Sequence, residues 1–148
     1  MINWTIKKFD ELTPHELYAI LRLRSEVFVV EQNCVFLDMD NKDQLCYHLL
    51  AWDNDLLAGY TRLVPPGIAF EFPSIGRVVT SPLARNTGIG KKIMGKSIEE
   101  LLNIYGQTPI RIGAQLYLKK FYESFGFIQT GDIYDEDGID HIHMTRKN

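Results

Sequence analysis

The chain has few cysteines and no long apolar run, and both absences exclude classes of protein. Only Cys34 and Cys46 occur among the 148 residues, and they do not stand in a C-x-x-C spacing. A disulfide scaffold or a zinc ribbon is therefore excluded, and a reduced cytoplasmic protein is expected. No apolar stretch approaches the roughly 20 residues that a membrane-spanning helix needs. The segment from Met1 to Lys8 also lacks the apolar region of a secretory signal peptide.

The chain lacks an excess of positive charge as well. It has 16 Lys and Arg against 19 Asp and Glu, which gives a formal net charge of −3 at pH 7. Nucleic acids and anionic membranes are bound through basic surfaces, so neither is an expected partner. The composition, 45% hydrophobic and 24% charged, is that of a globular protein. The length fits a single domain, residues 1–148, that is large enough to bury a core.

Hydrophobic spacing and turn residues divide the chain into strands and helices. Short apolar or alternating runs predict strands, and apolar stripes at helical spacing predict helices. Strands are expected at Ile2–Lys7, Leu45–Trp52, Leu56–Val64, Ile75–Thr80, Pro109–Ala114, Phe127–Gln129 and His141–Arg146. Helices are expected at Pro14–Phe28, Ile89–Tyr105 and Leu118–Phe125, with a loop or short strand at Ile68–Phe72. This order is typical of an α+β or mixed α/β fold.

The first predicted helix carries a charged residue within its apolar stripe. Thr13 and Glu16 can form a capping box and Pro14 suits the first turn, so the start of the helix is well defined. Arg24 then falls among the apolar positions. It is either a snorkelling arginine at the rim of the core or a residue whose guanidinium holds a buried or cleft carboxylate in a bidentate way.

The segment Ile75–Lys92 has the pattern of an anion-binding loop. A strand leads into a short loop with Arg85, Gly88 and Gly90, and a helix begins at once. Glycines let the backbone approach a ligand closely, and the first helical turn offers unpaired N–H groups and a positive dipole end. Positive charge gathers here on Arg85, Lys91, Lys92 and Lys96. The sequence therefore predicts a phosphate site.

Two common phosphate-binding loops do not fit this segment. The P-loop pattern G-x-x-x-x-G-K-[ST] fails because Arg85 replaces its first Gly and Lys92 replaces its Ser or Thr. The dinucleotide pattern G-x-G-x-x-G fails because Ile93 stands at the third Gly. What remains is R-x-x-G-x-G after a strand, which is either a different coenzyme loop or a turn with an arginine.

The pattern R-x-x-G-x-G after a strand resembles the pyrophosphate loop of the GNAT superfamily of N-acetyltransferases, which bind acetyl-CoA. The segment Gly113–Phe127, which ends in Y-x-x-x-G-F, is similar to the second motif of that family. Further segments resemble its ElaA-like branch: Val27–Cys34, Ile75–Val78, Gly113–Gln115 and Tyr134–His141. The resemblance covers essentially the whole chain. It implies a central mixed, mostly antiparallel sheet flanked by helices.

The resemblance also implies an activity, which is direct transfer of an acetyl group from acetyl-CoA to a primary amine of a small molecule or peptide. Backbone groups of Val78, Val79 and Thr80 would bind the pantetheine arm and the acetyl carbonyl. The pyrophosphate would lie on Arg85, Asn86, Thr87, Gly88, Ile89, Gly90 and Lys91. Acetyl-CoA is then a co-substrate, and no metal is expected. The alternatives are a catalytically silent acyl-CoA-binding sensor or interaction module, and transfer of another acyl group.

Tyr122 is the expected general acid of this reaction. In the family arrangement it would lie near the thioester sulfur, where a phenol can protonate the thiolate that amine attack expels. The residue also belongs to an apolar helix face, so it can instead be a core tyrosine. The amine must lose a proton, and the candidate bases are Glu31, His48 and the loop residue Glu71. His48 stands on an alternating strand, which is equally typical of a structural histidine.

Three other signals lead to no predicted site. His141 and His143 share a strand face, but a zinc site needs three or four convergent ligands. The acidic stretch Asp38–Asp43 lacks the central glycine of a calcium loop and has Lys42 at a ligand position. Cys34 is either an acyl-carrying nucleophile or a passive thiol, and no neighbouring residue in the sequence activates it.

The acceptor is expected to be a cation. In the family fold, the acceptor cleft is built from the first helix, the segment after it and the loop near Glu71. The acidic residues of these pieces are Glu26, Glu31, Asp38, Asp40, Asp43 and Glu71, and the basic ones are Arg24 and Lys42. A field of that sign attracts a protonated amine, although the same carboxylates can simply solvate a loop. The chain is expected to act alone or as a homodimer.

Overall fold

The computed structural model describes the whole chain, residues 1–148. The strands are β1 (Asn3–Lys8), β2 (Tyr47–Asp53), β3 (Leu56–Val64), β4 (Ser74–Thr80), β5 (Ile110–Gln115), β6 (Phe127–Gln129), β7 (Tyr134–Glu136) and β8 (Ile139–Arg146). The helices are α1 (Pro14–Arg24), α2 (Ile89–Tyr105) and α3 (Lys119–Glu123), and a π-helical segment, η2 (Ser25–Glu31), follows α1. The predicted mixture of helices and mostly antiparallel strands is confirmed.

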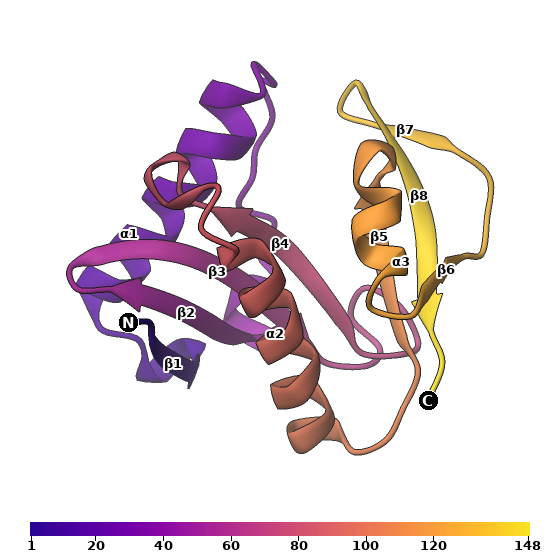
Figure 1. Cartoon of the computed structure of the whole chain (residues 1–148), viewed down its shortest axis with the longest axis horizontal. Helices are drawn as coiled ribbons and strands as arrows, with labels where there is room; N and C mark the ends of the chain where they lie inside the picture. Colours follow the sequence, from indigo (N-terminus) through magenta and orange to yellow (C-terminus); the bar gives the residue numbers. More distant parts are fainter.

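The strands form two sheets that lie side by side (Figure 1). The first has the order β1–β2–β3–β4, and the second has the order β5–β8–β6 with β7 paired to β8. The strands β4 and β5 begin next to each other, where the N–H of Arg111 donates to the carbonyl of Pro73 at 3.2 Å, and then diverge (Figure 1). The expected central sheet is therefore divided between β4 and β5.

The first helix begins where the sequence predicts it. The Glu16 N–H donates to Thr13 Oγ1 at 3.1 Å, and the Thr13 N–H donates to the Glu16 carboxylate at 2.8 Å, which completes the capping box. The regular helix ends at Arg24, and the predicted continuation to Phe28 is formed by η2, which reaches Glu31. Such wider turns occur frequently at functional sites, and this one carries Glu31 to the cavity described below.

Three apolar clusters hold the two sheets to the helices. The largest joins α2 to β5 and β8 through buried residues that include Met94, Ile112 and Met144. The second packs α1 on β2 and β3, and the third packs the start of α2 on the first sheet. Helix α2 therefore contacts both sheets and lies across the line where they part (Figure 1). Because it packs on both, it fixes the separation of β4 and β5.

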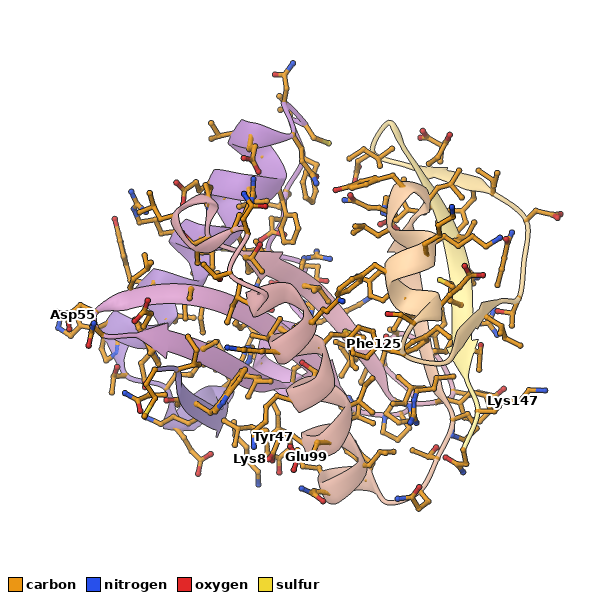
Figure 2. All side chains as sticks on the ribbon, viewed as in Figure 1. Lys8, Tyr47, Asp55, Glu99, Phe125 and Lys147 are labelled. Atoms are coloured by element: carbon orange, nitrogen blue, oxygen red, sulfur yellow. The ribbon has the colours of Figure 1, made fainter.

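The far end of α2 is held against the first sheet by aromatic packing. Tyr47 pairs with Lys8 across the β1–β2 ladder, and the Lys8 ammonium lies 5.8 Å from the centroid of the Tyr47 ring. Figure 2 shows these two side chains together beside α2. The Tyr47 ring also meets the Tyr105 ring edge to face, with 6.5 Å between centroids. This contact orients the helix whose other end forms the anion cradle.

Of the loop or short strand expected at Ile68–Phe72, the loop is found, because residues 68–72 form turns and bends. The structure differs from the prediction at other places: α3 ends at Glu123 and not at Phe125. Leu45 belongs to a short 3-10 turn, so β2 begins at Tyr47. Strand β7 is absent from the prediction because its sequence, YDE, has no apolar alternation. No helix of the chain is long and apolar enough to cross a membrane.

Candidate active site

A cavity of about 840 Å³ lies where β4 and β5 diverge. Its walls are contributed by β4, β5, β7, β8, α3, the end of η2 and the loop that follows η2. The predicted site residues that line it are Val78, Val79, Thr80, Arg85, Gly90, Glu31 and Tyr122. His48 and Glu71 do not line it, and of the predicted loop Arg85–Lys91 only Arg85 and Gly90 do. Strands and loops from both ends of the chain thus meet around one space.

Strand β4 forms one wall of the cavity. It is the edge strand of the first sheet, so its outer row of backbone N–H and C=O groups has no ladder partner. Its pairing with β3 slips by one residue, because Tyr60 opposes Val79 whereas Arg62 opposes Gly76. Arg77, within this bulge, has a φ of 51°. Bulges redirect the chain next to functional sites, and beyond this one β4 offers free backbone groups that an extended ligand can pair with.

The loop between β4 and α2 has the geometry of an anion cradle. Gly88 caps α2 with a φ of 80°, and Asn86 has a φ of 66°, conformations that glycine and asparagine adopt more readily than other residues. A Cβ atom on Gly88 or Gly90 would meet nothing within 4 Å, so the space over the helix start is open. Thr87 donates to the Ala84 carbonyl and fixes the loop. The first N–H groups of α2 are free to bind a phosphate group.

The basic residues of the predicted cradle do not all contribute to it. Lys96 pairs with two glutamates of its own helix, Glu99 and Glu100, at 3.4 Å each. The exposed basic side chains that remain at the cradle are Arg85, Lys91 and Lys92. Their charge adds to the positive end of the helix dipole, so the cradle keeps the sign that a phosphate ligand requires.

Arg85 forms a bidentate ion pair with Glu31. Its Nη1 donates to Glu31 Oε2 at 2.7 Å and its Nη2 donates to Glu31 Oε1 at 2.6 Å. These hydrogen bonds lower the pKa of Glu31, although both side chains are about two-fifths exposed, 42% and 38%. A carboxylate with a lowered pKa is a weaker base. Glu31 is therefore held by Arg85 of the cradle, and this pairing makes it a poorer candidate for the predicted base.

Tyr122 is nearly buried, with 5% of its surface exposed, and lines the cavity. Its ring packs edge to face against Phe121 and Phe127. Its hydroxyl makes no hydrogen bond within the protein and is not fully buried. Because Tyr122 lines the cavity, the hydroxyl opens into it. Burial raises the pKa of this phenol well above its usual value. The hydroxyl therefore keeps its proton at neutral pH and can donate it.

Most of the chain matches a known protein family. Residues 19–148 match the family model described as the acetyltransferase (GNAT) domain. This match includes β4, the cradle and Tyr122. The chain belongs to the GNAT acetyltransferases. The predicted family is thereby confirmed.

Relatives of this GNAT protein are similar along nearly their whole length. Protein ElaA of Escherichia coli is 42% identical over 149 residues, which cover 99% of this chain and 97% of ElaA. The crystal structure of E. coli ElaA has a TM-score of 0.93 and 41% identity, and the match covers 99% of this chain and 100% of that one. An acyl-CoA N-acyltransferase from Pseudomonas aeruginosa has a TM-score of 0.94 and 39% identity, and the match covers 99% of both chains.

A more distant structure shares the fold alone. It is a GNAT family acetyltransferase from Elizabethkingia anophelis with acetyl-CoA bound, at a TM-score of 0.67 and 18% identity. The match covers 99% of this chain and 98% of that one. The fold of this chain is therefore shared by a GNAT protein of quite different sequence.

His48 is held inside this GNAT domain away from the cavity. It is 1% exposed, its Nδ1 lies 2.7 Å from the Tyr60 hydroxyl, and its Nε2 lies 2.8 Å from the Asp43 carbonyl. Burial lowers its pKa, so the ring is neutral. Since both ring nitrogens are occupied and no face meets the cavity, the geometry is that of a structural histidine, and the expectation that His48 is the base does not fit it.

Arg24 lies at the centre of a buried ion-pair network. Its side chain is 0% exposed, and it donates to Asp38 at 2.7 Å and to Asp43 at 2.9 Å. Arg62 donates to the same Asp43 at 2.8 Å and to both oxygens of Asp40 at 2.8 and 2.9 Å. Of the two interpretations of Arg24, the one in which it holds buried carboxylates is confirmed. The network attaches the loop after η2 to α1 and β3.

The predicted acidic acceptor cleft is corrected by this network. Arg77 on β4 joins it through Asp38, with 2.8 Å between Nε and Oδ1. The three aspartates Asp38, Asp40 and Asp43 are thus neutralised by three arginines, Arg24, Arg62 and Arg77. The sequence analysis missed Arg62 and Arg77 as partners of these aspartates, because both lie on strands well after the acidic stretch. Glu26 and Glu71 do not line the cavity, and Glu31 and Asp40, which do, are paired with arginines. The predicted residues therefore give the cavity no negative field, and its other acidic residues, Glu136 and Asp137, come from the end of the chain.

The network predicts acid sensitivity of the folded state. Burial alone would raise the pKa values of Asp40 and Asp43, but hydrogen bonds and charge from Arg62 and Arg24 outweigh it and lower both. A lowered carboxyl pKa gives stability that is present above the unfolded value and lost as pH falls.

We expect the free energy of unfolding in urea to fall by on the order of 2 kcal/mol between about pH 5 and pH 2. Asp40 is partly exposed, so solvent screens its ion pair with Arg62 and limits the loss. The control is the same measurement in high salt, because salt screens the buried pairs far less than surface charges. An unfolding free energy that stays constant over this pH range would contradict the prediction.

Two contacts of the GNAT domain join its halves across the cavity. The Gln32 and Gln115 side-chain amides lie 3.3 Å apart, and the Cys34 thiol donates to the Asp137 carbonyl at 3.1 Å. The thiol is thus engaged in a structural bond, which is the passive role among the two predicted for it. The histidines of β8 line the cavity, but no group of three or more candidate metal ligands forms anywhere in the chain.

Proposed function

We propose that this protein is an N-acetyltransferase that moves the acetyl group of acetyl-CoA to a primary amine of a small molecule or peptide. The observation that carries the proposal is one continuous cavity that includes Arg85 and Gly90 at the start of α2, the edge of β4, and Tyr122. This order corresponds to the pyrophosphate, the pantetheine arm and the thioester of the coenzyme. The names of two structural neighbours support it, an acyl-CoA N-acyltransferase and an acetyltransferase with acetyl-CoA bound.

The coenzyme side of the proposed site is built from backbone groups and one arginine. The N–H groups of residues 88–91 would hold the pyrophosphate, because it is the ligand type that a helix start attracts. Arg85 would share its guanidinium between the pyrophosphate and Glu31, with which it already pairs. The backbone of Val78–Thr80 would pair with the pantetheine arm as an added strand.

The chemistry requires a proton donor for the departing sulfur. The amine nitrogen bonds to the acetyl carbonyl carbon, the carbon–sulfur bond breaks, and the sulfur leaves with the electron pair. Tyr122 supports the proposal because its protonated hydroxyl opens into the cavity. It would donate its proton to the thiolate and regain one from solvent before the next turnover.

Tyr122→Phe is expected to lower kcat by roughly 100-fold, because the ring stays in the core and only the proton donor is lost. The measurement is thiol release from saturating acetyl-CoA, with coenzyme A affinity followed by calorimetry. Tyr18→Phe is the matched control, since Tyr18 is 72% exposed on α1 and outside this cavity. An unchanged kcat in Tyr122→Phe would leave the residue with a packing role only.

The same assay tests the proposed function itself. Thiol release that depends on an added primary amine, with the acetylated amine found by mass spectrometry, is the expected result. A protein that binds acetyl-CoA but releases no thiol with any amine of a broad panel would instead be a silent acyl-CoA-binding module.

A further inference from the structure

The wall of the cavity opposite β4 carries two histidines that the proposed reaction does not yet use. In the β5–β8 ladder, Gly113 opposes His143 and Gln115 opposes His141. Directly opposed residues of antiparallel strands share a face, so these four residues lie together. Both histidines line the cavity. The opposite face of the same strands belongs to the apolar core under α2.

Tyr134 of β7 covers this face and fixes the rings. Its ring centroid lies 5.8 Å from that of His141 and 4.8 Å from that of His143. A Cβ atom at Gly113 would lie 2.9 Å from the Tyr134 hydroxyl, so only glycine leaves room for this ring. The two imidazoles are therefore held in defined orientations, as groups that exchange protons with a substrate must be.

The hydrogen bonds of His141 determine which of its nitrogens is free. Its Nδ1 lies 2.8 Å from the Ile139 carbonyl, which only accepts, so in the neutral ring Nδ1 carries the hydrogen and Nε2 keeps its lone pair. Nε2 makes no hydrogen bond within the protein and is not fully buried, and the carboxylate oxygen Oε2 of Glu136 lies 3.5 Å from it. Since His141 lines the cavity, this lone pair is open to a bound molecule.

In His143 the donor and acceptor nitrogens are reversed relative to His141. Its Nδ1 lies 3.3 Å from Nη2 of Arg111, and a guanidinium only donates, so Nδ1 accepts and the hydrogen of the neutral ring sits on Nε2. Burial and the charge of Arg111 lower the pKa of His143, which keeps the ring neutral. Of the two imidazoles, His141 alone offers the cavity a proton acceptor.

We propose that Nε2 of His141 accepts the proton that the amine nitrogen loses when it attacks the acetyl group. This inference rests on the proposed function and assigns its base. In the complete step, the nitrogen–carbon bond forms, the carbon–sulfur bond breaks, and the sulfur takes the proton of Tyr122. The proton leaving the nitrogen passes to Nε2 and then to water. The products are the amide and free coenzyme A, so atoms and charge balance.

Glu136 is the positioning residue for this proton transfer. Its Oε2 lies 3.5 Å from Nε2 of His141, close enough to stabilise the imidazolium once the proton has arrived. The other titratable groups that face His141 are Tyr134 from β7 and His143 from its own strand, whereas its β5 neighbour Gln115 is uncharged. Glu136 is therefore the negatively charged group that faces His141, and it adds to the Ile139 carbonyl in stabilising the imidazolium.

The test compares the wild type with His141→Gln in thiol release from acetyl-CoA, with phenethylamine as the probe amine. At neutral pH we expect kcat to fall by roughly 100-fold, with the affinity for coenzyme A unchanged. The deficit should shrink as pH rises, because hydroxide can then accept the proton that the attacking nitrogen loses. Glu136→Gln should lower kcat less, and its deficit should shrink with rising pH in the same way. His15→Gln, at an exposed site on α1 outside the cavity, is the matched control and should behave as wild type.

The outcomes separate this inference from the function on which it rests. If the wild type releases thiol and His141→Gln shows the same rate and pH profile, the inference alone is overturned. If the wild type releases no thiol with phenethylamine, glycylglycine or lysine amide, the proposed function fails and the inference fails with it. Nitrogen-15 NMR of the wild-type histidines is the second measurement and depends on no variant. A neutral His141 ring with its hydrogen on Nε2 would overturn the inference whatever the rates.

Discussion

Gly88→Glu is expected to abolish coenzyme A binding while the fold is retained. Gly88 caps α2 with a φ of 80°, and the space around its missing Cβ is empty, so a glutamate side chain would occupy the cradle. Its carboxylate would also repel the pyrophosphate and would satisfy the helix N–H groups that the phosphate otherwise binds. Because Gly88 has a positive φ, a glutamate there also strains the backbone of the loop, so urea unfolding must first show that the variant is folded.

The control for the added charge is Gly95→Glu. Gly95 lies on the same helix, is exposed and has nothing within 4 Å of its missing Cβ, so the same charge is added away from the cradle. Calorimetry should show coenzyme A binding in the control and none in Gly88→Glu. Binding by the wild type should also weaken with salt, because much of it is charge attraction at an exposed loop. Wild-type affinity in Gly88→Glu would show that the pyrophosphate lies elsewhere.

Arg24→Ala is expected to destabilise the fold by about 3–5 kcal/mol. The substitution removes a fully buried guanidinium and leaves Asp38 and Asp43 with fewer partners in the interior. An uncompensated buried charge is far more costly than a lost surface pair. Since the whole stability of a domain is typically about 5–15 kcal/mol, a substantial part of it depends on this side chain. The measurement is the free energy of unfolding in urea.

Arg22→Ala on the same helix provides the control for Arg24→Ala. Arg22 is 70% exposed at its side chain and lies 3.8 Å from Glu26 in an i, i+4 pair. Such exposed pairs contribute roughly 0.2–1 kcal/mol, so this variant should unfold at nearly the wild-type urea concentration. Equal losses in the two variants would mean that the buried network adds no stability beyond that of a surface pair.

The local elements and the coenzyme loop could be predicted from the sequence because they depend on residues close together in the chain. The capping box at Thr13 and Glu16, the stripe of α2 and the glycines at 88 and 90 each act over a few residues. Asn86 is a further example, since its side chain suits the left-handed φ of 66° that the cradle requires. The family resemblance added the order of these parts and the position of Tyr122.

The sequence predicted the acceptor side poorly, for a physical reason. The charge of Asp38, Asp40 and Asp43 was judged from neighbours in the chain, whereas their partners Arg62 and Arg77 come from β3 and β4. Electrostatic effects depend on distance in space, so only the folded structure shows that these carboxylates are neutralised. The same applies to Glu31, whose partner Arg85 is 54 residues away.

What the sequence by itself determined is the family, the strand and helix order and the anion cradle, because these follow from short-range pattern. What only the tertiary structure decided is which polar groups face the cavity. It turns His48 inward, where both nitrogens are bonded. It places His141 against the Ile139 carbonyl, so that Nε2, beside Glu136, is the nitrogen without a hydrogen bond. The two histidines look alike in the sequence. Their difference arises from strand register and burial, which set the hydrogen-bond partners of each ring.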